Sequence, residues 1–237
     1  MINIKNNIAD IEQQISLACQ QNTRKSEEVC LLAVSKTKPN ALIEQAYQAG
    51  QRHFGENYLQ EAVNKIHSLT QLDDIFWHFI GPIQSNKTKL IAENFSWVHS
   101  VERLKIAERL NNQRGQAMAS NPNLTPLNVC LQLNISEEES KSGINVDQLD
   151  ELAQFVNQCE YLTLRGLMAI PEKNAPKEIY LQMQHLFNQL KAQYPSVDTL
   201  SLGMSNDLTQ AIAAGSTMVR IGTAIFGARE YATNIQK

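Results

Sequence analysis

The sequence lacks a long apolar run, an excess of basic residues and closely paired cysteines. No apolar stretch approaches the roughly 20 residues that cross a bilayer, so we expect a cytoplasmic protein with no membrane segment. The formal net charge of −3 argues against a general nucleic-acid-binding protein, because such proteins are usually basic. We therefore expect neither a nucleic acid nor a membrane as a partner.

The spacing of cysteines and histidines argues against disulfide and metal sites. None of the four cysteines forms a CxxC pair, and Cys30 and Cys130 lie in apolar runs, where a thiol behaves as a small hydrophobic group. We expect reduced cysteines, with no disulfide framework and no zinc site. No two histidines have HxH or HxxxH spacing, so no metal site is expected. His78, near the end of an apolar run, is interpreted as a hydrogen-bonded wall residue.

Short apolar runs and helical stretches alternate along the chain. Hydrophobic residues make up 43% of it, enough for a sizeable core. Near the N-terminus, Ile4, Ile8, Ile11 and Ile15 recur at helical intervals, which predicts an amphipathic helix within residues 1–28 that packs on the rest. Eight candidate strands follow, separated by helical stretches: residues 29–36, 52–55, 75–80, 96–100, 127–135, 162–170, 197–202 and 216–222.

Eight strand–helix units in a chain of this length predict an α/β fold, a (β/α)8 TIM barrel. There is no linker rich in Gly, Ser or Pro, so we expect residues 1–237 to form a single domain. A doubly wound open sheet is the alternative, but no GxGxxG or Walker motif favours it. We expect residues 115–126 to form a long surface loop, with the preceding helix ending before Gly115.

The first apolar run ends in the segment AVSKTKP, which contains Lys36 and Lys38. Active-site residues of a barrel lie at the carboxyl ends of its strands. Alternation along a strand puts Leu32, Val34 and Lys36 on one face. If this face points inward, apolar walls and nearby cations favour the uncharged amine of Lys36, which can attack an aldehyde. The alternative is that both lysines are ordinary surface residues.

The seventh and eighth runs end in residues that suit a phosphate. The loops after these two strands of a barrel often bind phosphate at a helix N-terminus. Here Gly203 and Gly222 let backbone N–H groups approach an anion, and Ser201, Ser205 and Thr223 add hydroxyl donors. Helices predicted to begin near residue 206 and after residue 223 would direct their positive ends at the same region. The alternative is ordinary loop chemistry.

Arg220 shares a strand face with Met218 and Gly222, so it can point toward the same ligand. A phosphate site opposite a reactive amine is what pyridoxal 5′-phosphate (PLP) requires. An arginine at the pyridine nitrogen would donate a hydrogen bond and leave that nitrogen unprotonated, so the ring would withdraw electrons less strongly. The alternative for Arg220 is a rim charge paired with a carboxylate.

Seven segments between Leu31 and Arg229 together resemble the pyridoxal phosphate homeostasis protein family. The match runs from about Leu31 to Arg229, nearly the whole chain, and none of the motifs is broken. The family's fold resembles the barrel domain of bacterial alanine racemase, which agrees with the strand count. The segments are AVSKTKP, FGENYLQEA, HFIGPIQSNK, NISEEESKSG, RGLMAIP, LSLGMSND and STMVRIGTAIFGAR.

The resemblance implies a role for each matched residue. Lys36 corresponds to the lysine that forms a Schiff base with PLP, and Arg220 to the arginine at the pyridine nitrogen. The other PLP-binding residues implied are Asn57 and Met168 near the ring, and Ser201, Met204, Ser205, Gly222 and Thr223 around the phosphate. Two interpretations remain for four further lysines: they make the open end of the barrel electropositive, or they are ordinary solvated side chains. These are Lys38, Lys87, Lys89 and Lys141.

The resemblance also implies a function: binding and intracellular homeostasis of PLP, held for storage or delivery, without an established catalytic turnover. The implied partners are PLP itself and, as candidate recipients, apo PLP-enzymes, and we expect a monomer. A PLP-dependent racemase is the alternative. A racemase needs two bases. In alanine racemase the second base is a tyrosine from an additional domain, and we expect no such domain in residues 1–237. A barrel that binds another phosphorylated metabolite is a third hypothesis.

Overall fold

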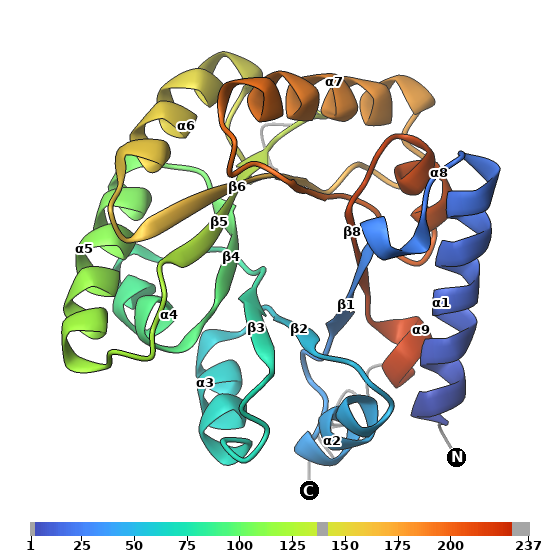
Figure 1. Cartoon of the computed structure of the whole chain (residues 1–237), viewed down its shortest axis with the longest axis horizontal. Coiled ribbons are helices and arrows are strands. Elements are labelled where there is room, and N and C mark those ends of the chain that lie inside the picture. The colour runs from blue at the N-terminus through green and yellow to red at the C-terminus, as the bar shows by residue number, and fades with distance from the viewer. Residues whose placement is uncertain (1–2, 137–141, 229–237) are drawn as a thin grey trace, which may run out of the picture.

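Eight parallel strands form a closed barrel (Figure 1). The computed structural model describes residues 3–136 and 142–228. The strands follow chain order around the barrel, and β1 closes it by pairing with β8, Cys30 opposite Met218. An open doubly wound sheet would not have this pair, so the barrel prediction is confirmed. The strands are β1 (Cys30–Val34), β2 (His53–Glu56), β3 (Phe76–Phe79), β4 (Trp97–Val101), β5 (Leu127–Leu133), β6 (Leu162–Ala169), β7 (Thr199–Ser201) and β8 (Met218–Ile221).

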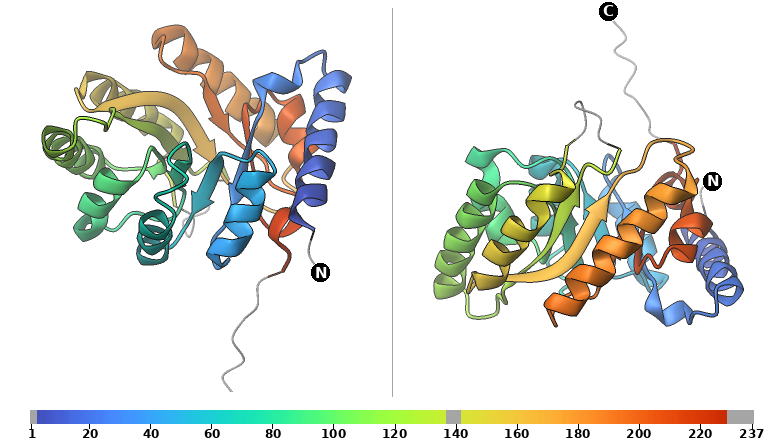
Figure 2. Two further views of the ribbon diagram at one scale, coloured as in Figure 1. Left: turned by 60° about the horizontal axis from the view of Figure 1, so that its bottom comes forward. Right: turned by 90° about the horizontal axis from the view of Figure 1, so that it is seen from above.

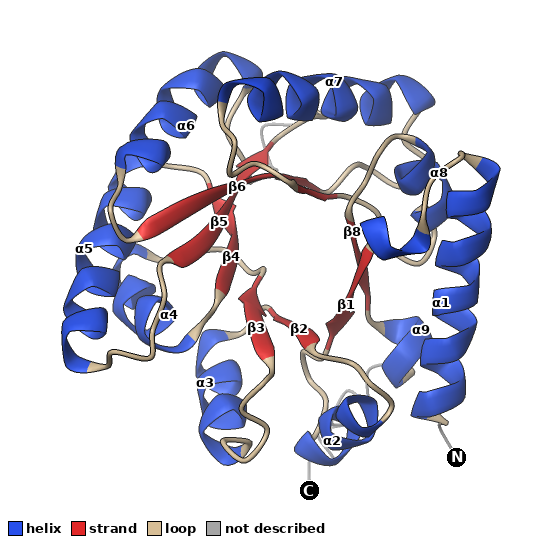
Figure 3. Ribbon diagram, in the orientation of Figure 1, coloured by secondary structure: helices blue, strands red, loops and turns tan. Residues whose placement is uncertain are grey.

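Helices lie outside the ring of strands, as the two colours of Figure 3 show. Because each helix returns the chain to the start of the next parallel strand, all strands end at the same side of the barrel. The helices are α1 (Ile4–Gln21), α2 (Asn40–Gln48), α3 (Leu59–Ser68), α4 (Thr88–Asn94), α5 (Leu104–Ser120), α6 (Leu149–Gln158), α7 (Lys177–Gln193), α8 (Leu208–Ala213) and α9 (Thr223–Phe226), with 3-10 turns at Ser26–Glu28, Ser85–Lys87 and Val146–Gln148.

The predicted N-terminal helix is α1, which lies beside α8 and α9 in Figures 1 and 2. All four isoleucines of its predicted apolar face are buried. The side chain of Asn3 accepts a hydrogen bond from the backbone N–H of residue 6 and caps the helix start. The side chain of Asn7 donates to the carbonyl of Ile225 over 2.7 Å. The first helix therefore joins the last elements of the chain, and the prediction of an added N-terminal helix is confirmed.

The apolar core lies mainly between the strands and the helices. In β1, Leu31 and Ala33 belong to this core. Leu32 lies between them and pairs in register with Arg220 of β8, so both residues face the barrel interior. The interior also holds buried polar side chains, among them His78 and His99. Buried polar groups need hydrogen-bond partners, and those partners define the two sides of the candidate site.

The predicted surface loop at residues 115–126 is partly wrong, because α5 continues through Gly115 to Ser120. A Cβ at Gly115 would lie 2.6 Å from the ring of Tyr161. This glycine therefore does not end the helix; it lets the helix approach the Tyr161 ring. The chain leaves the helix at Asn121, which has extended backbone angles.

Cysteine chemistry in the described part of the chain agrees with the expected reduced thiols. All four cysteines lie in that part and carry free thiols. Burial raises the pKa of both Cys30 and Cys130 to about 12, which disfavours the nucleophilic thiolate at neutral pH. Within residues 3–136 and 142–228, no group of three or more His, Cys, Asp or Glu side chains could hold a metal ion. No helix in the same ranges is long and apolar enough to cross a bilayer.

Candidate functional site

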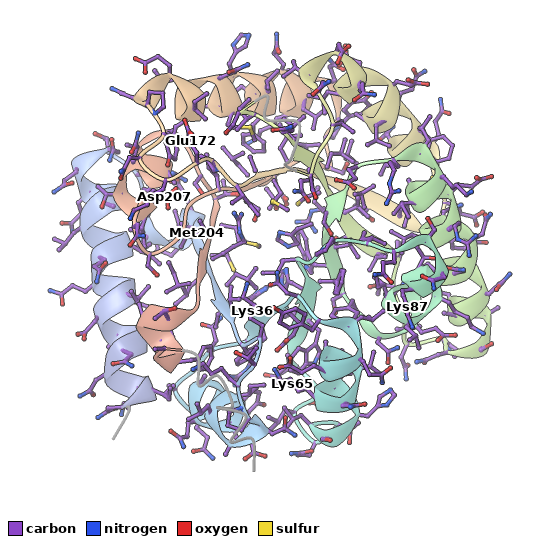
Figure 4. The ribbon with its side chains drawn as sticks, turned by 180° about the vertical axis from the view of Figure 1, so that it is seen from behind. Lys36, Lys65, Lys87, Glu172, Met204 and Asp207 are labelled. Carbon is purple, nitrogen blue, oxygen red and sulfur yellow. The ribbon has the colours of Figure 1, made fainter. Side chains whose placement is uncertain are left out.

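The predicted site residues gather where the strands end. Figure 4 shows Lys36 and Met204 near the centre of the ring of strands, whereas Lys87 lies farther out. Lys36 follows β1 and Met204 follows β7, and β8 pairs with both of these strands. The barrel therefore brings together two loops that are far apart in the sequence.

Lys36 lies in a turn directly after β1, which ends at Val34, two residues earlier than predicted. Leu32 faces the interior, so alternation directs Val34 inward as well, and Lys36 follows at the next matching position. The side chain of Lys36 is half-buried. The inward direction of the Lys36 side chain stays a prediction from the alternation.

The turn that carries Lys36 is held by its own backbone and by a neighbouring strand. The N–H of Ser35 donates to the carbonyl of Gly55 over 3.0 Å, and the N–H of Lys38 donates back to the carbonyl of Ser35 over 3.1 Å. Thr37 has φ of 62°, in the left-handed region that β-branched residues avoid. A strained residue of this kind persists only where surrounding contacts hold it.

Those contacts come from a buried ion cluster of Glu56, Glu61 and Lys65. The ammonium nitrogen of Lys65 lies 2.8 Å from Oε1 of Glu56 and 2.5 Å from Oε1 of Glu61. It also donates to the carbonyl of Ser35 over 2.8 Å. Burial raises the pKa of Glu56, and Lys65 acts in the opposite direction. We call Ser35–Lys38 and these three charged residues the amine side.

Each carboxylate of the amine side also contacts the turn. The hydroxyl of Ser35 donates to Oε1 of Glu56 over 2.6 Å, and the N–H of Thr37 donates to Oε1 of Glu61 over 2.6 Å. The ion cluster therefore fixes the backbone on both sides of Lys36. Sequence reasoning missed this cluster. A carboxylate at a strand exit was its only signal, and nothing in the spacing identifies Lys65 on α3 as the partner.

Arg220 lies on β8 with 5% of its surface exposed. One terminal nitrogen donates to the carbonyl and the hydroxyl of Ser201, over 2.7 and 2.8 Å, and the other donates to the carbonyl of Ala169 over 2.9 Å. Burial lowers the pKa of Arg220 to about 10, so it stays charged at neutral pH. It is a buried cation with neutral acceptors, and the alternative of a rim charge paired with a carboxylate is wrong.

The loops after β7 and β8 present small and hydroxyl-bearing residues at the surface. Gly203 has φ of 98°, and a Cβ there would lie 2.5 Å from that of Ala211, so only glycine fits. Ser205 and Thr223 are exposed, and Gly222 is half-buried. The helix predicted near residue 206 begins at Leu208, and α9 spans only Thr223–Phe226. Helices this short contribute little positive charge at their N-termini. Hydroxyl and backbone N–H groups are therefore the main hydrogen-bond donors available to an anion here.

Asn57 and Met168 lie on other parts of the interior. A cavity of about 230 Å³ opens at the ends of β2, β3, β5 and β6, and Asn57 lines it. The Oδ1 atom of Asn57 is buried and has no hydrogen-bond partner among the described residues. Met168 is buried in a small apolar cluster with Trp97 and Cys130. The lining also includes Ile80, Gln132, Asn134 and Ile170.

The remaining lysines have different environments. Lys38 donates to the carbonyl of Ala228 over 2.6 Å and so joins the first turn to the segment after α9. Lys89 lies 3.7 Å from a carboxylate oxygen of Glu93, and Lys87 is exposed at the end of a 3-10 turn. Lys141 lies outside the described residues. None of these contacts directs Lys38 or Lys89 at a ligand.

Known proteins resemble this chain along nearly its whole length. Residues 7–230 match the family model of the alanine racemase N-terminal domain. The chain is 54% identical to the pyridoxal phosphate homeostasis protein of Escherichia coli K12, over 98% of this chain and 99% of that protein. It is 51% identical to the protein of the same name from Haemophilus influenzae, over the full length of both.

Solved structures agree with these relatives. PipY of Synechococcus elongatus without PLP has a TM-score of 0.82 and 35% identity, over 94% of this chain and all of that one. The same protein with PLP bound has a TM-score of 0.79. Alanine racemase from Corynebacterium glutamicum has a TM-score of 0.67 at 12% identity, over 98% of this chain and 62% of that one, and shows the fold alone. This chain belongs to the pyridoxal phosphate homeostasis protein family.

Proposed function

We propose that this protein binds PLP at the open end of the barrel and holds it through Lys36 for storage or delivery. The observation that carries the proposal is the pairing of two unlike groups at one mouth. A half-buried lysine follows β1, and the neighbouring strand β8 carries a buried arginine whose acceptors are neutral. PipY, a relative at 35% identity, is solved with PLP bound.

The residues present fit each part of this cofactor. When bound, PLP supplies an aldehyde that condenses reversibly with an amine, and Lys36 presents that amine. Arg220 has only donors and stays protonated, so it suits a ring nitrogen that accepts a hydrogen bond. Such a nitrogen carries no proton, which limits electron withdrawal by the ring. A binding role then fits the geometry better than a racemase does.

The other predicted contacts divide between the ring and the phosphate. Asn57, with its unpaired buried oxygen, and Met168 belong to the ring end of the site. Ser205, Gly222 and Thr223 are accessible enough to meet a phosphate, with Met204 beside them. Ser201 is fully buried and its hydroxyl bonds Arg220. In our proposal Ser201 therefore supports the arginine and does not touch the phosphate.

Covalent mapping tests the assignment of Lys36. Wild type, Lys36→Ala and Lys38→Met are incubated with PLP, reduced with borohydride and digested for mass mapping. We expect a reduced PLP adduct on Lys36 in wild type and in Lys38→Met, and no adduct in Lys36→Ala, which retains only noncovalent binding. An undiminished adduct in Lys36→Ala would show that another amine is the anchor.

Storage and delivery make different predictions for the release of PLP. For delivery, the loaded protein activates an apo PLP-enzyme faster than the measured release of free PLP permits. Equal rates leave storage as the function. We also propose a cytoplasmic monomer, for which light scattering should report the chain mass of 26.7 kDa. A catalytic role instead predicts deuterium exchange at the α-carbon of some amino acid in heavy water.

A further inference from the structure

Three histidines, a serine and Arg220 form one continuous hydrogen-bond chain through the barrel interior. Nδ1 of His53 lies 3.0 Å from Nε2 of His78, and Nδ1 of His78 lies 2.9 Å from Nε2 of His99. Nδ1 of His99 lies 3.0 Å from the hydroxyl of Ser201, which accepts from Arg220 over 2.8 Å. This hydrogen-bond chain begins at His53, the first residue of β2, and ends at Arg220, which in the proposed function meets the ligand.

The arginine sets the direction of the whole chain. A guanidinium has only donors, so the Ser201 hydroxyl accepts from Arg220. Ser201 is fully buried, and its own proton has one acceptor within reach in the described structure, Nδ1 of His99. Nδ1 of His99 therefore carries no proton. The opposite direction would leave the buried hydroxyl proton without an acceptor, which is costly.

The same logic continues along the imidazoles. A neutral imidazole with a bare Nδ1 carries its proton on Nε2. His99 thus donates from Nε2 to Nδ1 of His78, and His78 donates from Nε2 to Nδ1 of His53. His78 and His99 have the same protonation pattern, with the proton on Nε2. One charged group at the end of the chain determines the tautomers of rings on two other strands.

The surroundings keep these rings neutral. His78 and His99 are fully buried, and the ring of His78 stacks on Trp97 with centroids 5.2 Å apart. Burial lowers the pKa of His99 to about 3, with Arg220 acting in the same direction. Neutral partners orient the guanidinium without cancelling its charge. A carboxylate in place of Ser201 would orient it equally well but would neutralise the charge that a ligand meets.

We propose that His99, oriented by His78, is a positioning residue for PLP binding: it takes the Ser201 proton and so holds that hydroxyl as an acceptor for Arg220. The proposal rests on the proposed function, because the ligand is what Arg220 meets. Among the described residues, the side-chain hydrogen bonds of His99 go to His78 and Ser201 and not to Arg220. The effect of His99 passes through one hydroxyl, which makes the effect separable from that of Lys36.

NMR of histidine-labelled protein tests the direction of the chain without any ligand. Long-range 15N–1H correlation spectra distinguish the two neutral tautomers and the protonated ring. We expect the neutral Nε2–H form for His78 and His99 at neutral pH. An Nδ1–H form or a protonated ring at His99 would overturn the proposal. The exposed His185 on α7 serves as an internal reference.

Binding measurements test the consequence for PLP. His99→Phe removes the acceptor, and we expect PLP to bind roughly tenfold more weakly, the equivalent of one hydrogen bond, with a shifted visible absorption band. His99→Asn keeps an acceptor near Nδ1 and should stay within about threefold of wild type. Ser201→Ala should match His99→Phe, and the double variant should lose no more than either alone, since both changes break one link.

The two proposals fail in different ways. Wild-type affinity and absorption in a folded His99→Phe protein would overturn the positioning role while leaving PLP binding intact. Additive losses in the double variant would do the same. If His99→Phe does not fold, the His99→Asn and Ser201→Ala pair carries the comparison: equal losses in these two variants would overturn the role. A wild-type protein that does not bind PLP overturns the proposed function, and the tautomer spectra still decide the direction of the chain.

Discussion

The two sides of the barrel mouth are built on opposite electrostatic principles. The amine side fixes its turn with three buried or half-buried charges, Glu56, Glu61 and Lys65. The guanidinium side, which we define as Arg220 with Ser201, His99 and His78, holds a single charge among neutral groups. The first side has its charges paired with one another. In the second, the printed hydrogen-bond acceptors of the one charge are neutral.

The difference follows from what each side must keep in place. Lys65 donates to the backbone carbonyl of Ser35, and Glu61 accepts from the backbone N–H of Thr37, so the ion cluster fixes a turn of the main chain. The neutral chain contacts the guanidinium of Arg220 and fixes a side chain. Removing one partner of a buried ion pair costs about 3–5 kcal/mol in stability, because the other charge stays buried without a partner. A neutral hydrogen bond contributes only about 1 kcal/mol. The two sides should therefore respond differently to mutation and to pH.

The largest expected effect breaks the amine side. Lys65→Met leaves the fully buried Glu56 without its cation, and we expect a loss of about 3–5 kcal/mol in the free energy of unfolding. Urea denaturation measures this loss. The matched control is Lys89→Met, which removes an exposed pair with Glu93 and should cost no more than about 0.5 kcal/mol. Adding Glu56→Gln to Lys65→Met should restore part of the stability. A loss below about 1 kcal/mol would contradict the role given to the cluster.

Acidification tests the guanidinium side. Burial holds the pKa of His78 well below its usual range and lowers that of His99 to about 3, so both stay neutral in the folded state. In the unfolded chain each takes up a proton near pH 6.5, so the unfolded state binds more protons and stability falls as pH falls. Between pH 6.5 and 5.5 we expect a loss of roughly 1 kcal/mol for each ring.

Unfolding curves at several pH values measure how steeply the free energy of unfolding changes with pH. Two variants serve as controls for this slope. His185→Gln, an exposed substitution, should leave the slope unchanged, whereas a folded His99→Phe protein should lose the contribution of one ring. His78 and His53 remain, and burial lowers the pKa of both. On the amine side the sign is reversed, because the raised pKa of Glu56 favours the folded state as pH falls through it. Equal slopes in wild type and in a folded His99→Phe protein would mean that His99 can be charged in place.

A smaller effect concerns Lys38, which shares the AVSKTKP segment with Lys36. Lys38→Met loses the hydrogen bond to the carbonyl of Ala228, and we expect a cost of about 1 kcal/mol in stability with no change in PLP affinity. Thermal unfolding and PLP titration measure the two quantities. A large loss of PLP affinity would extend the binding site to this second lysine.

The smallest effect tests the strain in the turn itself. Thr37 has φ of 62°, a region that Asn tolerates better than a β-branched residue. Thr37→Asn keeps the backbone N–H that Glu61 accepts, and we expect a gain of about 0.5 kcal/mol in the free energy of unfolding. Chemical denaturation against wild type decides the sign. A clear loss of stability would show that the threonine side chain contributes more than its backbone strain costs.

Periodicity predicted the barrel and the faces of its strands because both depend on local patterns. The alternation in residues 29–36 directed Lys36 inward, and the structure places Leu32 level with Arg220 in the interior. The hydrogen-bond chain from His53 to Arg220 could not be predicted from the sequence. Its partners are separated by 25, 21 and 102 residues, and contact depends on the height of each residue on its own strand. His78 was recognised only as a wall residue because its neighbours could not be known.

The ends of helices were also predicted less accurately than the strands. Gly115 reads as a helix end by its intrinsic preference, but in α5 it makes room for the ring of Tyr161, a contact that no local pattern reveals. The Glu56–Lys65 pair was missed for a related reason. A strand exit and a helix supply one charge each, and only packing of α3 against the end of β2 brings the two charges within 2.8 Å.

By itself, the sequence determined the eight strands, the first helix, and the positions of Lys36 and Arg220 at strand ends, because residue period and motif are properties of neighbouring positions. Only the tertiary structure decided how those two groups are held. It buried Glu56 with Lys65 beneath the Lys36 turn, and it aligned His53, His78 and His99 behind Ser201 and Arg220. Closure of the barrel sets the heights of its strands relative to one another, and side chains distant in sequence meet only once those heights are set.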